Sequence, residues 1–217
     1  MKKIIISLLS ITFLTVSVYA QEENKLENEK AKEILNKLSK KSDSYSDITA
    51  EFSYNFFNSS EGIDEDMKGT IWIKKNMYKL DIVNVSVINN GKTMWYIMKD
   101  INEVQVMENN PEDEMNPSRI FTIYEEGYKY EYKEGIPLND KIYHSIYFYP
   151  EESESISKFV LSIDDKETEI SSIEIHNKDG GITTYKITNF LTNSSLSEEI
   201  FKFKKDEYPE IEIIDLR

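Results

Sequence analysis

The sequence predicts a mainly β protein of the α+β class, with about ten or eleven antiparallel strands and two helices. Residues 68–107 contain four or five short apolar strands in succession, with no helix between them. An amphipathic stretch precedes these strands, and a second group of strands follows from residue 128. Because consecutive strands joined by tight turns pair antiparallel, we expect antiparallel pairing within each group.

The first group of strands is a predicted meander. Strands are expected over residues 69–74 and 77–82, followed by a hairpin turn at Asn89-Asn90-Gly91-Lys92. The Asn-Gly pair tolerates the positive φ values of a type I′ turn. The return strand covers residues 93–98, and the next strand contains Val104 and Val106.

The return strand is apolar on both faces. Its alternating faces carry, on one side, Met94, Tyr96 and Met98 and, on the other, Trp95 and Ile97. A sheet with one wet face would alternate apolar and polar residues, so this strand is predicted to be covered on both sides. A helix can supply one cover. An ordinary second layer of core is the commoner source of the other cover, and an apolar ligand is the alternative.

The N-terminus has the pattern of a secretory signal. Lys2 and Lys3 precede an apolar run over residues 4–18, and Ala20 ends a stretch suited to cleavage. The run is shorter than the roughly 20 apolar residues that a membrane-spanning helix needs. We therefore expect a signal peptide at residues 1–20, and a soluble, exported single domain at residues 21–217.

A long helix is predicted after residue 30. Ala31, Ile34, Leu35 and Leu38 form one apolar stripe, with Lys and Glu on the opposite face. Such a helix needs a partner surface, and the sheet is the natural one. The next strand, over residues 45–57, alternates cleanly, and its apolar face carries Ile48, Ala50, Phe52, Tyr54 and Phe56.

A second, shorter helix is predicted between the two groups of strands. Asn116 is a suitable N-cap and Pro117 a suitable first helical residue, and Gly127 suits the C-terminal end. The segment carries Ile120 and Phe121, and at roughly ten residues it is too short to be stable alone. It is expected to be either a lid over an open barrel or a plug in its end.

The second group of strands is predicted over residues 128–133, 141–149, 158–163, 169–177 and 182–190, with a possible edge strand over 208–216. Asp179-Gly180-Gly181 makes the hairpin turn between the last two long strands.

The chain has no pattern typical of catalysis or metal binding. His144 and His176 are its two histidines, and each is expected to be a packed or surface residue. The adjacent carboxylates Asp164 and Asp165 are expected to be solvated at a turn, not an acid–base pair across a cleft. No phosphate loop, dinucleotide fingerprint or Gly-x-Ser-x-Gly motif occurs. We therefore predict that the protein is not an enzyme and needs no cofactor or metal.

The absence of cysteine and the net charge rule out or disfavour further kinds of site and partner. With no cysteine, it has no disulfide, no thiolate ligand and no lipobox residue for lipid attachment. The formal net charge of −14 disfavours nucleic acid and anionic membrane surfaces as partners. The same charge favours a monomer.

Several motifs in this order resemble the periplasmic outer-membrane lipoprotein carrier (LolA-like) family. They are Gly69-x-Ile71-Trp72-Ile73-Lys74-Lys75, Asn90-Gly91-Lys92-Thr93 with the following Trp95 and Tyr96, Asn102-Glu103-Val104, Asn116-Pro117 and Phe201-x-Phe203. The resemblance covers nearly all of the chain after residue 30. It implies a half-open antiparallel β-barrel with a long N-terminal helix and a short helical lid.

The resemblance also implies a function and a site. The function is to bind the acyl chains of lipoproteins in an apolar cavity and to carry them through the periplasm, from an inner-membrane release complex to an outer-membrane acceptor. The implied cavity residues are Phe52, Ile71, Ile73, Tyr78, Leu80, Ile120 and Phe121. The family closes its lid with an Arg latch, and the matching residue here is Lys75, which is followed by Asn76 where the family has Pro.

Three other functions are alternatives to a carrier. One is a non-catalytic lipid-binding or scaffold module of the cell envelope, whose barrel is filled by its own side chains. Another is an outer-membrane barrel, which strands shorter than about 9–11 residues disfavour. The third is an enzyme, which the missing catalytic motifs disfavour.

Overall fold

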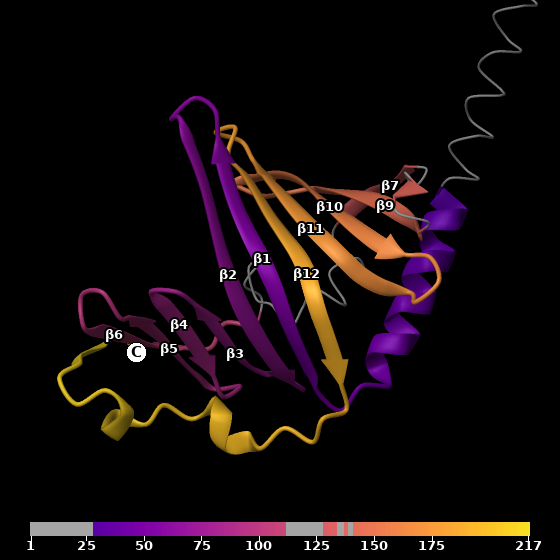
Figure 1. Cartoon of the computed structure of the whole chain (residues 1–217). Helices are drawn as coiled ribbons and strands as arrows, with labels where there is room; N and C mark the ends of the chain where they lie inside the picture. The colour runs from indigo at the N-terminus through magenta and orange to yellow at the C-terminus, as the bar shows by residue number, and fades with distance from the viewer. Residues whose placement is uncertain (1–27, 112–127, 134–136, 139–140) are drawn as a thin grey trace, which may run out of the picture.

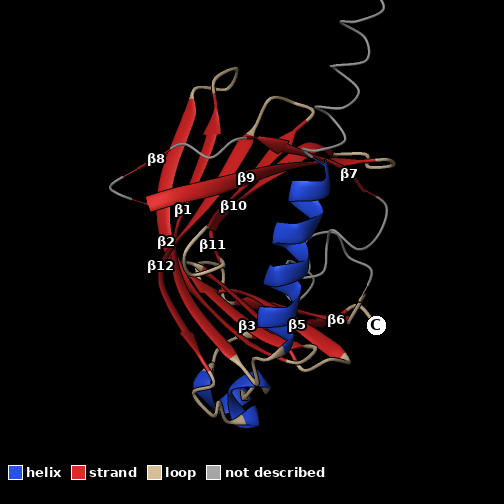
Figure 2. Ribbon diagram, turned by 90° about the vertical axis from the view of Figure 1, so that its right-hand side faces the viewer, coloured by secondary structure: helices blue, strands red, loops and turns tan. Residues whose placement is uncertain are grey.

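The structure, a computed structural model, describes residues 28–111, 128–133, 137–138 and 141–217. These residues form one strongly curved sheet, with an α-helix along the concave side and the C-terminal segment under the convex side (Figures 1 and 2). The sheet is open, because its two outermost strands, β13 and β7, do not pair with each other. The sheet is therefore half-open, as the sequence analysis expected.

Twelve strands follow one another in the order β13-β6-β5-β4-β3-β2-β1-β12-β11-β10-β9-β7, and β8 pairs with β9 off this path. Their bounds are β1 Ile48–Asn58, β2 Ile63–Lys74, β3 Met77–Ile82, β4 Val85–Asn89, β5 Thr93–Met98, β6 Glu103–Glu108, β7 Tyr128–Lys133, β8 Pro137–Leu138, β9 Lys141–Pro150, β10 Ile156–Asp164, β11 Glu169–Asn177, β12 Ile182–Thr192 and β13 Glu212–Asp215.

The strand count exceeds the expected ten or eleven because of two short strands that the sequence did not predict. β4 and β8 have five and two residues. Over so few residues, period-two alternation is a weak signal, and short strands are easily missed. β13 also differs in direction, since it pairs in parallel with β6 at the edge of the sheet.

Two groups of strands meet at the centre of the sheet. β1 pairs with β2 at the head of the meander and with β12 at the end of the second group, in both cases antiparallel. β1 and β2 are long and run past the ends of β3, so that their hairpin projects from the sheet (Figure 1). The centre of the sheet is therefore made by pairing the first strand with the last long strand.

The N-terminal helix covers the second group of strands. It occupies residues 28–43 of the described chain, and all four residues of its predicted apolar stripe are buried: Ala31, Ile34, Leu35 and Leu38. They join one core cluster with residues of β7, β9, β10 and β11. At its C-terminal end, Lys41 forms an ion pair with Glu169 of β11 at 2.8 Å.

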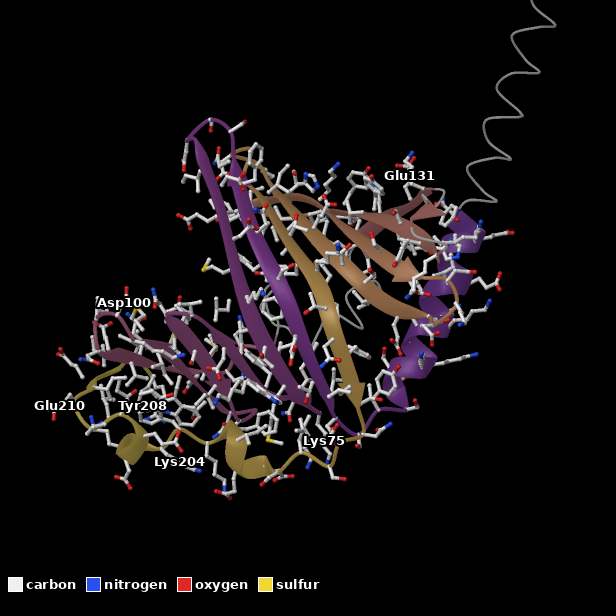
Figure 3. All side chains as sticks on the ribbon, viewed as in Figure 1. Lys75, Asp100, Glu131, Lys204, Tyr208 and Glu210 are labelled. Atoms are coloured by element: carbon white, nitrogen blue, oxygen red, sulfur yellow. The ribbon has the colours of Figure 1, made fainter. Side chains whose placement is uncertain are left out.

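The C-terminal segment covers the outer face of the meander. After β12 the chain forms two 3₁₀ helices, η3 (Glu198–Phe201) and η4 (Lys205–Glu207), and then β13. Phe203 stacks between Trp95 of β5 and Tyr208, with ring centroids 6.1 and 5.7 Å apart. Tyr208 lies under the meander in Figure 3. Ile97 is completely buried in this cluster, so the C-terminal segment covers the face of β5 that carries Trp95 and Ile97.

A buried carboxylate anchors the start of this segment. Asp47, 3% exposed, accepts hydrogen bonds from Ser46 Oγ at 2.9 Å and from the backbone N–H groups of Ser194 at 2.7 Å and Leu196 at 3.3 Å. Burial alone would raise the pKa of Asp47, but these hydrogen bonds together outweigh burial and lower it. Asp47 therefore holds the turn that leads out of β12 while it remains charged.

Some predicted segments lie outside the described residues. They are the signal peptide at residues 1–20 and the short helix with Asn116, Ile120 and Phe121. In the part of the chain that the structure covers, no helix combines the length and the apolar character needed to cross a membrane.

Candidate functional site

A cavity of about 570 Å³ lies on the concave side of the sheet. The strands β1–β5 and the turn between β3 and β4 supply Ile48, Ala50, Phe52, Tyr54, Met67, Ile71, Ile73, Leu80, Ile82, Asn84, Val85, Val87 and Tyr96. The strands β9–β12, with Ile156 at the start of β10, supply Phe148, Ile156, Phe159, Val160, Leu161, Ile170, Ile173, Ile175, Tyr185, Ile187 and Phe190.

Among the described residues, the lining of the cavity is apolar and carries no charged side chain. Its polar groups are the amide of Asn84 and the phenol groups of Tyr54, Tyr96 and Tyr185. A volume of about 300–1,000 Å³ with few polar groups is typical of sites that bind small apolar ligands.

The structure places most of the sequence-predicted cavity residues in this lining. Phe52, Ile71, Ile73 and Leu80 all line the cavity. Ile73 is paired across the sheet with Tyr78, so Tyr78 lies on the same face. Tyr78 is buried, however, and is not among the lining residues; its hydroxyl contacts the sulfur of Met94 at 3.3 Å. That any of these residues binds an acyl chain stays a prediction.

The floor of the cavity depends on a glycine. Gly69 of β2 is paired across the sheet with Phe52 of β1, and the ring of Phe52 lies over the position where a side chain would be. A Cβ atom at Gly69 would lie 2.5 Å from Phe52 Cζ and 2.9 Å from the backbone oxygen of Asp81. Any larger residue at Gly69 would displace the Phe52 ring from the floor.

A β-bulge decides which residues of β12 face the cavity. The register between β1 and β12 shifts between Glu51 and Phe52. Strict alternation from Tyr185 and Ile187 would place Asn189 in the cavity, but the extra residue of the bulge brings in Phe190 instead. The sequence analysis did not predict this wall. Residues 185, 187 and 190 are apolar, but they fall on one face of a strand only if a bulge lies between residues 187 and 190.

Three aromatic rings pack together at the β1–β12 junction. The ring of Tyr185 makes edge contacts with Phe52 and Tyr54, at centroid distances of 5.6 and 5.3 Å. Burial, and to a lesser extent the neighbouring Tyr54, raises the pKa of Tyr185 to about 12. The phenol therefore stays neutral at physiological pH, which suits an apolar wall.

Lys75 lies in the turn between β2 and β3. It is exposed and has a positive φ of 57°. Figure 3 shows it at the end of the meander opposite to Asp100. Within the described residues it makes no hydrogen bond or ion pair, and the lid segment with Ile120 and Phe121 lies outside them. Its role as a latch stays a prediction.

The two histidines lie away from the cavity lining. His144 bonds to Tyr132 Oη through Nδ1 at 2.9 Å and to Asp165 through Nε2 at 2.7 Å. His176 bonds to Glu174 at 3.2 Å. All three contacts join neighbouring side chains on the sheet and its turns. Among the described residues, no group of three or more His, Asp or Glu side chains could hold a metal ion.

The expectation of two solvated carboxylates at residues 164 and 165 was wrong for the first. Asp165 is exposed, but Asp164 is buried and accepts a bond from Lys141 Nζ at 2.8 Å. It also caps the turn by accepting the backbone N–H groups of Lys166 and Glu167, both at 3.0 Å. These bonds explain why the carboxylate of Asp164 can be buried at a turn. Sequence alone does not reveal them.

Comparison with known proteins finds a family and several solved structures that this chain resembles. The family described as outer membrane lipoprotein carrier protein LolA matches residues 42–204. An uncharacterized conserved protein from Thermus thermophilus superposes with a TM-score of 0.58 at 11% identity, over 86% of this chain and 99% of that chain. A LolA superfamily protein from Nitrosomonas europaea gives a TM-score of 0.45 at 10% identity, over 80% and 97% of the two chains. Comparison with the curated proteins finds no match.

The family match extends from the end of the N-terminal helix to the residues after η3. It therefore includes every strand that lines the cavity. On this match, the chain belongs to the outer membrane lipoprotein carrier protein LolA family.

Proposed function

We propose that this protein is a periplasmic carrier that binds the acyl chains of lipid-modified proteins and transfers them towards the outer membrane. The observation that carries the proposal is the cavity of about 570 Å³, whose lining is apolar except for one amide and three phenol groups. A barrel filled by its own side chains, the alternative scaffold function, would leave no such space. Membership of the LolA family supports the same conclusion.

The mechanism is transfer of hydrocarbon out of water. Each methylene that enters an apolar site contributes about 0.8 kcal/mol. Because the described residues of the lining include no charged side chain, this wall suits the hydrocarbon and would leave the polar part of the cargo outside. Release needs an open form close in energy to the closed form, since a ligand can only shift an equilibrium by its differential affinity.

Five residues form the proposed acyl-chain site within the described chain: Phe52, Ile71, Ile73 and Leu80 in the cavity wall, and Tyr78 beneath it. Ile120 and Phe121 complete it from the proposed lid, and Lys75 is the proposed latch. A Lys latch should be weaker than an Arg latch, because Lys has three donors on a flexible stem and Arg has five in a planar fork.

The proposed partners follow from the carrier role. Cargo would be received from an inner-membrane release complex and delivered to an outer-membrane acceptor, with the carrier monomeric between them. The formal net charge of −14 supports this, because like charge opposes both self-association and adsorption to anionic membrane surfaces.

The test combines isolation with a variant. Protein purified from an envelope extract should carry acylated molecules that mass spectrometry identifies after denaturation. Leu80→Glu should abolish this binding, because an unpaired carboxylate in an apolar site is costly. Val83→Glu is the matched control. Val83 lies near Leu80 in sequence, in the turn between β3 and β4, but it is 66% exposed, so a carboxylate there stays in water.

Two results would overturn the proposal. One is wild-type protein that is isolated without any acylated molecule and binds none when it is offered. The other is a folded Leu80→Glu variant that retains cargo as well as the Val83→Glu control does.

A further inference from the structure

The N-terminal half of β2, residues 63–68, has an open edge. We propose that this open edge is a docking site for an extended, positively charged segment of a partner protein, which adds to the sheet as one further antiparallel strand. The inference goes beyond the proposed carrier function and does not depend on what the cavity holds.

The open edge arises because β2 is longer than β3. β2 has 12 residues, Ile63–Lys74, and only residues 69–74 pair with β3. Residues 63–68 pair with β1 along one side. Along the other side, no strand of the described chain pairs with them. Figure 1 shows the β1–β2 hairpin projecting past β3 and β4. A row of backbone N–H and C=O groups is therefore left for another strand.

The hairpin that carries the open edge is held in place on its other side. β1 pairs with β12 as far as Phe57 and Ile182. The buried Asn58 fixes the turn by accepting bonds from Ser60 N at 3.1 Å and Ser60 Oγ at 2.7 Å. A strand that is already ordered costs less free energy to bind than a loop that must first be ordered. The open edge is therefore preformed for strand addition.

The charge of the open edge selects the partner. Asp64, Glu65 and Asp66 are consecutive and exposed. Asn55 Nδ2 donates to Asp64 Oδ1 at 2.9 Å and to Asp66 Oδ1 at 3.1 Å, so a neutral amide holds two carboxylates together without cancelling their charge. A second copy of this chain would bring the same acidic edge, and like charges on paired strands repel. Lys or Arg on an incoming strand would instead attract these carboxylates.

Alternation along β2 sets the side-chain pattern that the partner needs. Met67 is paired with Tyr54, and both line the cavity. The concave face of the open edge therefore carries Ile63, Glu65 and Met67, and the convex face carries Asp64, Asp66 and Lys68. Apolar residues suit the positions opposite Ile63 and Met67, basic residues suit the three acidic positions, and an acidic residue suits Lys68. The sequence Glu-Ile-Lys-Lys-Lys-Val, read from Lys68 to Ile63, meets this pattern.

The base of the open edge is apolar. The last pair between β2 and β3 is Gly69 with Ile82. Val83 follows in the turn and is 66% exposed. An added strand would lie in line with β3, so that its near end would lie beside Val83. Strand addition would therefore shield an exposed apolar side chain as well as pair the backbone.

The first experiment measures binding and its place. A fluorescein-labelled peptide with Glu-Ile-Lys-Lys-Lys-Val as its core, flanked by Gly and Ser, is titrated with the mature chain at low salt, with fluorescence anisotropy as the readout. The peptide should bind, and hydrogen exchange should slow in residues 63–68 but not in β13, the parallel strand at the sheet edge. No binding, or slowed exchange in β13 in place of residues 63–68, would overturn the proposal.

Two N-methylated peptides distinguish strand addition from attraction between charges. Successive residues of a strand direct their backbone groups to opposite edges. Methylation of one alternate set of amides therefore blocks the edge that faces β2, and methylation of the other set blocks the edge that faces solvent. One of the two peptides should bind at least about tenfold more weakly, and the other about as tightly as the parent. Equal affinities of the two methylated peptides would show that charge alone holds the peptide and would overturn the proposal.

Charge reversal on the protein tests the chemistry of the partner. The double variant Asp64→Lys with Asp66→Lys should bind the basic peptide at least about tenfold more weakly. A peptide with Glu at the two matching positions should bind this variant more tightly than it binds wild type. The matched control is Asp206→Lys with Glu207→Lys, which changes the net charge equally at two exposed positions in η4.

Circular dichroism and thermal melting first check that both double variants are folded. If the variant at residues 64 and 66 does not fold, the methylated peptides still test the proposal on wild type. A folded variant at residues 64 and 66 that binds the basic peptide as tightly as wild type, or a control that loses as much affinity, would show that the open edge is not the docking site.

Discussion

The two halves of the concave face differ in what covers them. On β9, β10 and β11, the apolar side chains are buried under the helix with Leu35 and Leu38 in one cluster. On β2, β3 and β5, side chains such as Ile71, Leu80 and Tyr96 are only partly buried and face the cavity. Both halves present the same kind of apolar strand face.

The comparison shows that chain composition does not decide which face becomes a core and which a binding site. A helix has one apolar stripe and can cover only a few strands. The helix at residues 28–43 covers the second group of strands, so the inner face of the meander is left for another partner. The cavity therefore extends from the uncovered meander to the edge of the helix-covered cluster, where Phe148, Phe159 and Leu161 also line it.

Truncation in the helix half should have the largest effect on stability. Leu35→Ala removes a side chain that is 2% exposed and should cost about 2–5 kcal/mol of unfolding free energy. Leu80→Ala in the open half should cost less than about 2 kcal/mol, because an existing cavity has less packing to lose. Urea denaturation of both variants measures the difference, and equal losses would show that the two halves are packed alike.

Loss of the Asp47 anchor should have the next largest effect. Asp47→Ala leaves the N–H groups of Ser194 and Leu196 without their carboxylate acceptor. Hydrogen bonds to a charged group contribute about 1.5–3 kcal/mol, and the loss should fall in that range by chemical denaturation. Asp43→Ala, on an exposed residue at the end of the helix, is the control and should change little. If Asp47→Ala is as stable as wild type, the C-terminal segment does not depend on Asp47 to stay in place.

Acid should weaken the protein through two buried carboxylates, Asp47 and Asp164. The pKa of Asp47 is lowered, as is that of Asp164, where bonds from Lys141 and the turn outweigh burial. A group with a lowered folded-state pKa stabilises the protein above its unfolded pKa, about 3.9 for Asp. This stability is lost as the pH falls through the folded-state value. The melting temperature should therefore decrease as the pH falls below about 4, and it should decrease less in Asp47→Asn. Identical profiles of melting temperature against pH in the two proteins would show that Asp47 does not contribute to the acid sensitivity.

The smallest expected effect concerns the turn that begins the open half. Lys75 has a φ of 57°, a conformation that costs a residue with a Cβ about 1 kcal/mol. Lys75→Gly should therefore raise the unfolding free energy by at most about 1 kcal/mol. If Lys75 is also the latch, cargo transfer to an acceptor should become faster in Lys75→Gly and slower in Lys75→Arg. Transfer rates that match wild type in both variants would leave Lys75 with a turn role alone.

The sequence predicted the parts of the fold that depend on local pattern. The stripe of Ala31, Ile34, Leu35 and Leu38 forms a helix and is buried, and the Asn90-Gly91 turn joins β4 and β5. The helix outcome follows because a period of 3.6 assigns residues to one face of a helix. The resemblance to the carrier family, and not periodicity alone, placed Phe52, Ile71, Ile73 and Leu80 on the inner face, where they line the cavity.

The remaining features depended on contacts between distant segments. Phe190 entered the cavity wall through a bulge opposite Glu51, and Asp164 was buried by Lys141, 23 residues away in sequence. Phe201 and Ile211 became core residues, although they lie in a polar C-terminal segment. The periodicity of a local stretch of sequence predicts neither a register shift between strands nor an ion pair between distant residues.

The sequence by itself determined that β5 would be apolar on both faces and that both would need cover. Only the tertiary structure decided that the C-terminal segment covers Trp95 and Ile97, while Tyr96 faces a cavity. The physical reason is that alternation sorts side chains between two faces but does not identify what packs on each. That depends on the curvature of the whole sheet and on how far one helix and one terminal segment can reach.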